Sequence, residues 1–318
     1  MAPMAGVTDL PYRLINRKYG CKFAFTEMIN IRGLSYKNRK TFKILSTTHS
    51  DRPLGVQLEG TKKKYFLKAL EEIYDYPNKI LDINAGCPAK KVVKKGAGAA
   101  LMQNPDKLED ILISLVKKSP HPVTLKIRTG WDKNSLNAPQ IAKMARDAGV
   151  QAIFIHGRHR EQGFEGAIDF KTIKEVVRSV DIPVIGSGNI FTPIHAKLML
   201  KKTGCRGLLV ARGTYGNPWI FKDIKKYLTG DNLNTRAKVK KVTKVMREHF
   251  KLLLKYHGTK NGVYRFRKYF VYYTRYFKYA RPLREKVFNT TDKEKVFSII
   301  ELFGKNCMRQ FSTYQYSP

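Results

Sequence analysis

One cysteine lies in the segment of this chain whose residue types are best suited to chemistry. Cys87 stands between a glycine and a proline in the run INAGCPAKKV, which covers residues 83–92 and begins as an apolar stretch. Asn84 precedes it by three positions, and Lys90 and Lys91 follow it. A cysteine in this place can pack in the core, bind a metal, form half of a redox pair, or act as a reactive group at a strand end.

The other cysteines narrow these alternatives. Cys21, Cys205 and Cys307 form no C-x-x-C pair with each other or with Cys87, and their spacing suits neither zinc nor a disulfide framework. We therefore expect no metal, a reducing compartment and, by default, the cytoplasm. The chain also lacks an apolar run of about 18 residues and a signal peptide, so we expect no membrane partner. A glycine–proline loop at a strand end favours a reactive thiol over packing.

Such residues need a scaffold, and the first two-thirds of the chain predict one. Apolar or β-branched runs recur at residues 23–29, 53–58, 79–88, 122–130, 151–158, 182–189 and 206–213. Amphipathic helical patterns lie between them, for example at 106–118, 138–150 and 170–180. Apolar strands that alternate with helices are typical of a parallel sheet that is covered on both faces.

Eight such repeats predict a (β/α)8 TIM barrel over residues 1–232, if Met1–Met4 is counted as the stub of a first strand. An open doubly wound sheet is the alternative, but equal repeats with polar residues at every strand end favour the closed barrel. A barrel strand needs about five residues. We therefore expect that the N-terminus of this sequence is truncated, and an unusually short first strand is the alternative.

The composition changes near residue 230, and a second domain is expected at 233–318. Residues 236–318 hold no barrel-strand run, and 21 Lys and Arg stand there against 5 Asp and Glu. We predict an all-α helical domain. Its segment 263–280, VYRFRKYFVYYTRYFKYA, mixes aromatic and basic residues. This segment suits either a helix with an aromatic core face and a solvated basic face, or a surface that stacks on RNA and neutralises it.

The charge of the whole chain points in the same direction. Lys and Arg total 61 against 25 Asp and Glu, a formal net charge of +36. Because a charge of this size repels itself in the compact state, a polyanionic partner is a reasonable inference. A generally lysine-rich composition and binding to a membrane surface are the alternatives.

Chemistry in barrels of this kind gathers at the carboxyl ends of the strands. The residues that the sequence places there are Pro3, Met4, Ala5, Glu27, Gln57, Asn84, Cys87, Lys126, Arg128, His156, Arg158, Ser187, Gly188, Asn189, Ala211, Arg212 and Gly213. This set has few carboxylates and many hydrogen-bond donors. The last two loops stand where such barrels often bind phosphate through backbone N–H groups. For either loop alone, glycines that only form a turn are the alternative.

Burying two of these side chains costs free energy unless a ligand bonds to them. Lys126 has apolar neighbours in VTLKIRTG, so it needs an anion or a polar ligand, or else a structural ion pair. His156 in IFIHGR is either a satisfied core residue or a second contact to the same ligand. The segment 94–102, KKGAGAALM, lacks the third glycine of a dinucleotide loop, so we assign it to the Cys87 loop and the helix start after it.

Taken in order, the motifs identify a family. They are APMAGVTD (2–9), TEM (26–28), VQL (56–58), DINAGCPAKKV (82–92), LKIRTGW (125–131), IHGR (155–158), GSGNI (186–190) and VARGTYGNPWIF (210–221). The chain resembles the tRNA-dihydrouridine synthases over nearly its full length, and most of all the bacterial branch with the CPAKKV cysteine loop. The resemblance implies an FMN-binding barrel, a C-terminal helical domain that holds tRNA, and NADPH or NADH as the reductant. We expect a monomer.

The resemblance also implies roles for particular residues. Those assigned to FMN are Pro3, Met4, Ala5, Gln57, Lys126, His156, Ser187, Gly188, Asn189, Ala211 and Arg212. The first three line the flavin ring, Gln57 bonds its polar edge, and Lys126 and His156 contact it, while the last two loops hold its phosphate. Ser187 begins a run where the family often has Asn-Gly-Asp. Ala211 stands where glycine is common, which puts the close approach to phosphate at that position in doubt.

The reaction of the family gives Cys87 a role. Hydride passes from the flavin to C6 of uracil, negative charge builds on the C4 oxygen and C5, and Cys87 donates the proton to C5. A free thiol has a pKa of about 8.5, so it is mostly protonated at neutral pH. The residues assigned to the RNA substrate are Asn84, Arg158, Lys90, Lys91, Arg267 and Lys268. Asn84 is placed to hydrogen-bond the uracil, and the two lysines after the cysteine either lower the pKa of its thiol or face tRNA phosphates.

The base must leave the tRNA fold to reach the flavin, so we expect the basic charge and the C-terminal helices to supply binding energy. Two other functions are weighed against this one. The first is an FMN-dependent reductase of a small pyrimidine or enone, against which the segment 263–280 argues. The second is a non-catalytic RNA-binding protein on a barrel scaffold, which the absence of bound FMN from the purified protein would support.

Overall fold

The computed structural model of this protein describes residues 1–231 and 238–311. Contacts divide the chain into two compact units. One comprises Met1–Asp9 and Cys21–Gly213 and holds the strands, whereas the other comprises Leu10–Gly20 and the chain from Thr214 onward and is helical. The boundary expected at 232/233 lies outside the described residues, so the predicted domains 1–232 and 233–318 stay a prediction.

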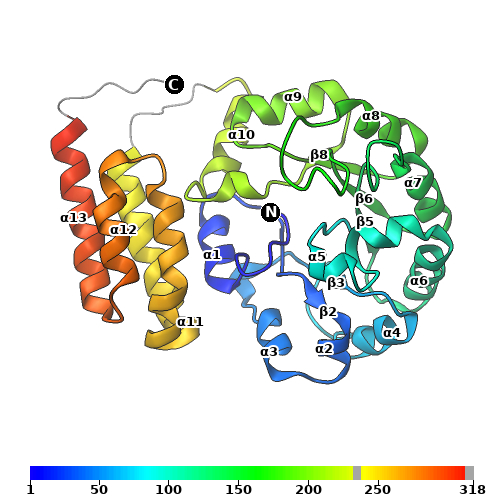
Figure 1. Cartoon of the computed structure of the whole chain (residues 1–318), viewed down its shortest axis with the longest axis horizontal. Helices are drawn as coiled ribbons and strands as arrows, with labels where there is room; N and C mark the ends of the chain where they lie inside the picture. Colours follow the sequence, from blue (N-terminus) through cyan, green and yellow to red (C-terminus); the bar gives the residue numbers. More distant parts are fainter. Residues whose placement is uncertain (232–237, 312–318) are drawn as a thin grey trace. The chain divides into compact units, whose positions relative to one another are not determined.

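The strand-bearing unit has an eight-stranded parallel sheet (Figure 1). Its strands are β1 (Ala24–Phe25), β2 (Ile29–Asn30), β3 (Leu54–Glu59), β4 (Ile80–Ala85), β5 (Val123–Arg128), β6 (Ala152–His156), β7 (Val184–Ser187) and β8 (Gly207–Leu208). All but β2 follow one another across the sheet in chain order, and β2 pairs with β3. A curled parallel sheet with helices between its strands confirms the predicted barrel fold.

The two ends of the sheet meet at the N-terminal residues. No strand is assigned to Met1–Met4. The Ala2 N–H donates to the Val210 carbonyl at 2.9 Å, and the Phe25 N–H donates to the Met1 carbonyl at 3.3 Å. The expected first strand is therefore reduced to a short bridge between β1 and the β8 segment.

Helices cover the outside of this sheet (Figure 1). The helical segments that accompany the strands, with 3-10 turns written as η, are α2 (Ile31–Ser35), α3 (Arg39–Phe42), η1 (Lys43–Leu45), η2 (His49–Asp51), α4 (Lys63–Glu71), α5 (Lys90–Val93), η3 (Gly98–Gln103), α6 (Pro105–Lys118), α7 (Ala138–Asp147), α8 (Phe170–Ser179), α9 (Pro193–Thr203) and η4 (Arg212–Thr214). The helices predicted at 106–118, 138–150 and 170–180 correspond to α6, α7 and α8.

The helix α6 illustrates how the sequence specifies these elements. The Asn104 side chain accepts from the Lys107 N–H at 3.2 Å, and a proline occupies the first turn. The buried residues of α6 are Leu108, Ile111, Leu112 and Leu115. Their spacing places them on one face of the helix, which packs towards the sheet.

Inside the barrel, the side chains change from apolar to polar along the strands. One apolar cluster holds Ala2, Phe25, Phe154 and Leu209. Side chains alternate along a strand, so residues at even spacing from these also point inward. The strand register aligns the inward polar residues in rows, which are Gln57 with Asp82 and Thr124, Asn84 with Lys126, and Arg128 with His156 and Ser187. The first of these rows lies within the barrel, and the rows of Asn84 and of Arg128 lie towards the carboxyl ends of their strands.

The helical unit contains α1 (Leu10–Lys18), α10 (Ile220–Leu228), α11 (Lys238–Thr274), η5 (Lys278–Ala280), α12 (Arg281–Phe288) and α13 (Lys293–Phe311). α11 is interrupted at Gly258, where φ is 74°. Its two halves pack together through Phe250 and Phe266, whose ring centroids lie 4.7 Å apart. α1 packs on α11 through Tyr12, which stacks on Tyr269 with a centroid distance of 5.4 Å. The helical C-terminal region is thus confirmed, and α1 joins it although it precedes the strands in sequence.

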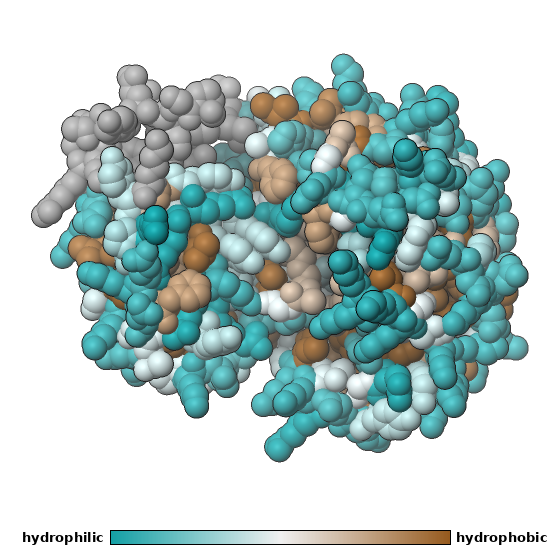
Figure 2. Space-filling model, viewed as in Figure 1, coloured by the Kyte–Doolittle hydropathy of each residue, from teal (hydrophilic) through white to brown (hydrophobic). Residues whose placement is uncertain are grey.

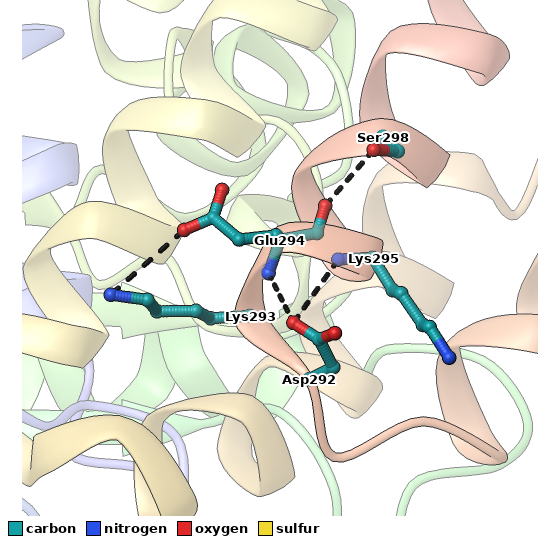
Figure 3. Close-up of polar contacts among 5 residues, drawn as sticks. All are labelled: Asp292, Lys293, Glu294, Lys295 and Ser298. Atoms are coloured by element: carbon teal, nitrogen blue, oxygen red, sulfur yellow. Dashed lines mark hydrogen bonds and ion pairs between the residues drawn. The ribbon is translucent and has the colours of Figure 1, made fainter.

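The start of α13 is capped by an acidic side chain (Figure 3). The Asp292 carboxylate accepts from the backbone N–H of Glu294 at 2.8 Å and of Lys295 at 3.5 Å. Lys293 approaches Glu294 to 3.9 Å, and Ser298 Oγ donates to the Glu294 carbonyl at 3.0 Å. An N-cap of this kind stabilises a helix by about 1 kcal/mol, so it marks the boundary of α13.

Polar side chains dominate the surface. Figure 2 shows hydrophilic residues over most of the face in view, with smaller apolar areas between them. Within residues 1–231 and 238–311, no helix combines the length and the hydropathy that crossing a bilayer requires.

Candidate active site at the carboxyl end of the barrel

A chain of hydrogen bonds links buried side chains of β3, β4 and β5. Gln57 Nε2 donates to Asp82 Oδ2 at 2.6 Å, and Asn84 Nδ2 donates to Gln57 Oε1 at 2.7 Å. Thr124 Oγ1 donates to the other Asp82 oxygen at 2.7 Å. Burial raises the pKa of the Asp82 carboxyl, while the bonds from Gln57 and Thr124 and the charge of Lys126 oppose that shift. The network fixes Gln57, which the sequence assigned to the flavin edge.

The same network reaches the loop that carries Cys87. Asn84 Oδ1 accepts from the backbone N–H of Cys87 at 2.8 Å and of Gly86 at 3.1 Å. The Ala99 N–H donates to the Cys87 carbonyl at 3.0 Å. Arg128 Nε donates to the Gly86 carbonyl at 2.7 Å. The loop is therefore held by a strand-end amide, by a buried guanidinium and by the segment that follows it.

Gly98 allows that following segment to lie against the cysteine. Its φ is +60°, and a Cβ atom placed on it would lie 2.6 Å from the Cys87 carbonyl oxygen and 2.9 Å from Val92 Cγ1. Only glycine permits this approach without moving the loop. The segment KKGAGAALM belongs to the Cys87 loop and the start of η3, as the sequence predicted.

The Cys87 thiol is half-buried, and burial raises its pKa above the ordinary value. A hydrogen bond with the Ala89 backbone opposes this shift, Glu59 adds to it, and Lys126 and Arg128 lower the pKa. The group is therefore a protonated thiol at neutral pH. This is the state that a proton donor needs.

Lys90 and Lys91 lie exposed on α5, directly after the loop. Neither is among the charges that shift the pKa of Cys87, whereas Lys126 and Arg128 are. This difference favours the interpretation in which the two lysines face a partner in solution over the one in which they tune the thiol.

Lys126 lies beside Asn84 in the strand register, next to the thiol loop. Burial lowers the pKa of Lys126 and the charge of Arg128 lowers it further, against the opposing charges of Asp82 and Cys87. Its ammonium group forms no hydrogen bond with any residue in the described ranges. This favours a bound anion or polar ligand over a structural ion pair.

His156 is neutral. Burial lowers its pKa well below the usual range, and the charges of Arg128, Lys126, Arg158 and Arg212 lower it further. Its ring nitrogens have no hydrogen-bond partner in the part of the chain that the structure describes. A buried ring without a partner argues against the satisfied core residue and for a contact to a ligand.

Arg158 and Arg212 bring two guanidinium groups to the same place. Arg158 donates to the Gly166 carbonyl through Nη2, but its buried Nε and Nη1 meet no acceptor among the described residues. Arg212 lies 5.1 Å from the ring centroid of Phe164 and 5.6 Å from that of Phe191. Buried donors without acceptors beside several cations indicate a site for a ligand that is anionic and rich in carbonyl oxygens.

The loop after β7 has the backbone shape that suits phosphate. Ser187 is buried, and the next two residues have positive φ, 127° at Gly188 and 48° at Asn189. A Cβ atom on Gly188 would lie 2.5 Å from Ile168 Cδ1, so glycine is needed at this turn. Ala211 and Arg212, which follow β8, are both half-buried.

Residues 3–5 form a turn at the rim where the barrel closes. The Met4 carbonyl accepts from the Val7 N–H at 3.0 Å, and the Gly6 N–H donates to the Glu27 carboxylate. Pro3 and Met4 are half-buried and Ala5 is exposed, so this segment can meet a ligand at the rim.

Two buried residues of the site had no role assigned from the sequence. One is Asp82, for which a signal existed, because it stands two residues before Asn84 and thus on the same side of β4. The other is Arg128, which also donates to the His159 carbonyl at 3.0 Å and so links the loops after β4 and β6. Burial lowers the pKa of Arg128 to about 10, and the group remains charged at neutral pH. Its partners are backbone carbonyls far away in sequence, which no motif records.

The remaining predicted contacts, Arg267 and Lys268, belong to the helical unit and not to the group at the barrel end. Arg267 donates to the Thr290 carbonyl at 3.2 Å and lies 5.5 Å from the ring centroid of Tyr264. Tyr264 itself is 69% exposed. The buried residues of the same segment are Val263, Phe266, Tyr269, Phe270, Tyr273, Thr274 and Ala280. The segment 263–280 therefore combines a largely aromatic core face with exposed tyrosines and half-buried basic residues.

Metal and disulfide chemistry find no support among these residues. Within the described ranges, no group of three or more His, Cys, Asp and Glu is placed to hold a metal ion. The four cysteines are free, and Cys21, Cys205 and Cys307 are buried.

Comparison with known proteins gives one family. The family described as Dihydrouridine synthase (Dus) matches residues 1–311. The chain is 36% identical to tRNA-dihydrouridine synthase B of Pasteurella multocida over 307 residues, which cover 96% of this chain and 92% of the relative. It is 38% identical to tRNA-dihydrouridine synthase B of Shewanella oneidensis over 273 residues, which cover 86% and 85% of the two chains.

Solved structures resemble the fold at low identity. An old yellow enzyme homologue from Zymomonas mobilis gives a TM-score of 0.51 at 12% identity, over 73% of this chain and 85% of that one. The 6-hydroxypseudooxynicotine amine oxidase of Pseudomonas geniculata N1 gives a TM-score of 0.52 at 12% identity, over 77% and 50% of the two chains. At such identity the likeness extends to the fold alone.

Proposed function

Because the chain belongs to the dihydrouridine synthase family, as its motifs predicted, we propose that it is a flavin-dependent tRNA-dihydrouridine synthase. It reduces the C5=C6 bond of uridine in tRNA, with FMN as the cofactor and NADPH or NADH as the reductant, and acts as a cytoplasmic monomer. The observation that carries the proposal is the protonated Cys87 thiol on a fixed loop at the carboxyl end of a barrel, beside donors that lack acceptors in the part of the chain that the structure describes.

The donor set fits FMN, which offers a phosphate and two carbonyl oxygens as acceptors. The residues that would hold it are Pro3, Met4, Ala5, Gln57, Lys126, His156, Ser187, Gly188, Asn189, Ala211 and Arg212. Lys126 and the neutral His156 are donors without a hydrogen-bond partner among the described residues, and the turn at Gly188 and Asn189 suits the phosphate. When bound, FMN supplies the hydride that adds to C6 of uracil.

Cys87 supplies the proton. Negative charge builds on the C4 oxygen and C5 as C6 is reduced, and the thiol donates its proton to C5 and becomes a thiolate. Burial keeps the thiol protonated until then, and the charges of Lys126 and Arg128 favour the thiolate that is left. Water restores the proton after the product leaves.

Arg158 and Asn84 hold the base. The Nε and Nη1 groups of Arg158 are buried donors that a uracil carbonyl can satisfy. The amide oxygen of Asn84 accepts from the Cys87 loop, whereas its Nδ2 group donates to Met28 Sδ at 3.2 Å. Since a thioether is a weak acceptor, a uracil carbonyl replaces it readily.

The RNA is held by basic residues of both expected domains. Lys90 and Lys91 follow the cysteine loop and meet phosphates next to the extruded base. Lys268 and the outer side of Arg267, beside the exposed ring of Tyr264, add contacts from the helical unit. Extrusion of a base costs a few kcal/mol, roughly what several phosphate contacts return.

The test is turnover on tRNA that lacks dihydrouridine. Purified wild-type protein with FMN and NADPH should form dihydrouridine, detected by mass spectrometry of the digested tRNA. Cys87→Ala should keep its bound flavin, seen by absorbance, and lose most turnover, because the flavin contacts remain while the proton donor is gone. Cys87→Ser should fall between the two. Full turnover by Cys87→Ala, or reduction of free uridine but not of tRNA by the wild type, would contradict the proposal.

A further inference from the structure

Asp82 has no place among the residues that touch the ligands, yet it stands at the head of the hydrogen-bond chain that ends at Cys87. It is fully buried, and so is Gln57, which donates to it at 2.6 Å. Asn84 then donates to Gln57 at 2.7 Å and accepts from the Cys87 N–H at 2.8 Å. Three hydrogen bonds in series therefore connect a strand carboxylate with the loop of the thiol.

The direction of every link follows from the first. A carboxylate only accepts, so the Gln57 amide must present its nitrogen to Asp82 and its oxygen to Asn84. Asn84 must then present its nitrogen to Gln57, which leaves its oxygen for the N–H groups of Gly86 and Cys87. A primary amide has a donor end and an acceptor end of nearly equal shape, so its orientation is selected by its partners, which here are the carboxyl group of Asp82 at one end of the chain and the N–H groups of Gly86 and Cys87 at the other.

We propose that Asp82 is a positioning residue, whose carboxyl group accepts from Gln57, orients the amides of Gln57 and Asn84 and thereby holds the Cys87 loop in its reactive position. This inference deepens the proposed function, on which its turnover readout rests. The link to the loop rests on the hydrogen bonds alone.

The reversed arrangement shows what the carboxylate prevents. An asparagine at position 82 can donate to Gln57 Oε1, which turns the Gln57 nitrogen towards Asn84 and the Asn84 oxygen towards Gln57. The Asn84 nitrogen then faces the N–H of Cys87, so two donors oppose each other and the loop loses its bond to the strand. An unpaired buried donor costs about 1–3 kcal/mol, which is enough to release a short loop.

The energetics also argue that the carboxylate is not there for stability. Burial raises the pKa of Asp82, which means that its ionised form is costly in the folded protein. Lys126 offsets part of this cost. A residue that costs stability and yet orders two amides towards the thiol loop is typical of a functional site.

The experiment compares Asp82→Asn with Thr124→Val. Thr124 donates to the other oxygen of Asp82 at 2.7 Å, so its loss removes an equal bond and leaves the chain to Cys87 intact. The first readout is the alkylation rate of Cys87 by iodoacetamide, measured by peptide mass spectrometry. The second is turnover on tRNA, and the third is the melting temperature.

In Asp82→Asn, iodoacetamide should alkylate Cys87 several-fold faster than in the wild type. Turnover should fall about 100-fold, since a shift of about 1 Å at a reacting group lowers the rate by that factor. Thr124→Val should stay within a few-fold of the wild type in both. The buried cysteines, Cys21, Cys205 and Cys307, report global opening, and their alkylation should not change. Equal effects of the two variants, or a wild-type alkylation rate in Asp82→Asn, would overturn the proposal.

A double variant that restores the direction of the hydrogen bonds keeps the test valid if Asp82→Asn folds poorly. In the double variant Asp82→Asn with Gln57→Glu, the asparagine donates to the new carboxylate, whose other oxygen accepts from Asn84 as before. Alkylation of Cys87 should return to the wild-type rate. Gln57 belongs to the proposed flavin site, so alkylation and not turnover is the readout here. A double variant that folds but keeps fast alkylation would refute the positioning role of Asp82. Failure of the wild type to act on tRNA would refute only the proposed function.

Discussion

Replacing Gly98 by alanine should displace Cys87 while the flavin contacts stay in place. The added Cβ would lie 2.6 Å from the Cys87 carbonyl oxygen, 2.9 Å from Val92 Cγ1 and 3.0 Å from Cys87 Cβ. The carbonyl cannot yield easily, because the Ala99 N–H already binds it at 3.0 Å. One contact is with backbone and the others are with the short side chains of Val92 and Cys87, so the Cys87 loop itself must move.

The chain offers a matched control at Gly96. This residue has φ of +73°, close to the +60° of Gly98, but a Cβ atom on it would meet only Thr61 Oγ1, at 3.6 Å. Both alanines incur the left-handed backbone strain of about 1–2 kcal/mol. Only Gly98→Ala adds overpacking, worth about 1–3 kcal/mol more. The difference between the two variants therefore isolates the contact with the cysteine loop.

The assay measures dihydrouridine formed in tRNA, bound flavin and melting temperature for both variants. Gly96→Ala should lower the melting temperature by a few degrees and keep most of its turnover. Gly98→Ala should lose about 100-fold in turnover while it retains flavin, because a misplacement of about 1 Å at a reacting group has that effect. Equal turnover in the two variants would refute the reasoning that this approach sets the position of Cys87.

Two further predictions concern pH and salt. Burial raises the pKa of Cys87 above the ordinary value of a thiol, and the donor form is the protonated thiol, so the single-turnover rate with pre-reduced enzyme should stay level near neutral pH and fall only as pH rises through the raised pKa. A decline that is complete below pH 8 would contradict this. Lys90→Ala with Lys91→Ala should weaken tRNA binding and reduce the slope of log K against log salt by about two, whereas Lys117→Ala with Lys118→Ala, in the last turn of α6, should leave it unchanged. Equal slopes for the two pairs would argue against phosphate contacts beside the cysteine loop.

The barrel was predictable because its strands carry their own signals. β4 lies within the predicted run 79–88 and β5 within 122–130, since buried parallel strands read as continuous apolar stretches between helical patterns. The first strand was the exception, because Met1 and Ala2 form only a short bridge, to Phe23 and Phe25 on one side and to Val210 on the other, with no apolar run to announce it. The helix α1 also escaped the sequence-based division, since its partners on α11 lie more than 200 residues further along the chain, as with the Lys18–Glu248 ion pair at 2.8 Å, 230 residues apart.

The candidate site was predictable to the level of its motifs and not of its hydrogen bonds. Cys87 stood out through its loop residues, and Lys126 and His156 through the cost of burying them. The role of Arg128 could not be predicted, because this residue binds the Gly86 carbonyl 42 positions away in the sequence. Asn84 was expected to meet the base, and its oxygen holds the Cys87 loop as well. A motif records which residues are present, whereas the orientation of an amide depends on partners that only the fold brings together.

The central claim is that this protein makes dihydrouridine in tRNA with Cys87 as the proton donor. Its most direct test maps dihydrouridine by mass spectrometry in tRNA from cells that lack the gene, complemented with the wild type or with Cys87→Ala. The account predicts that dihydrouridine is missing from defined positions in the deleted strain, returns with the wild type, and does not return with Cys87→Ala expressed at an equal level with flavin bound. Unchanged dihydrouridine in the deleted strain, or full recovery with Cys87→Ala, would contradict it.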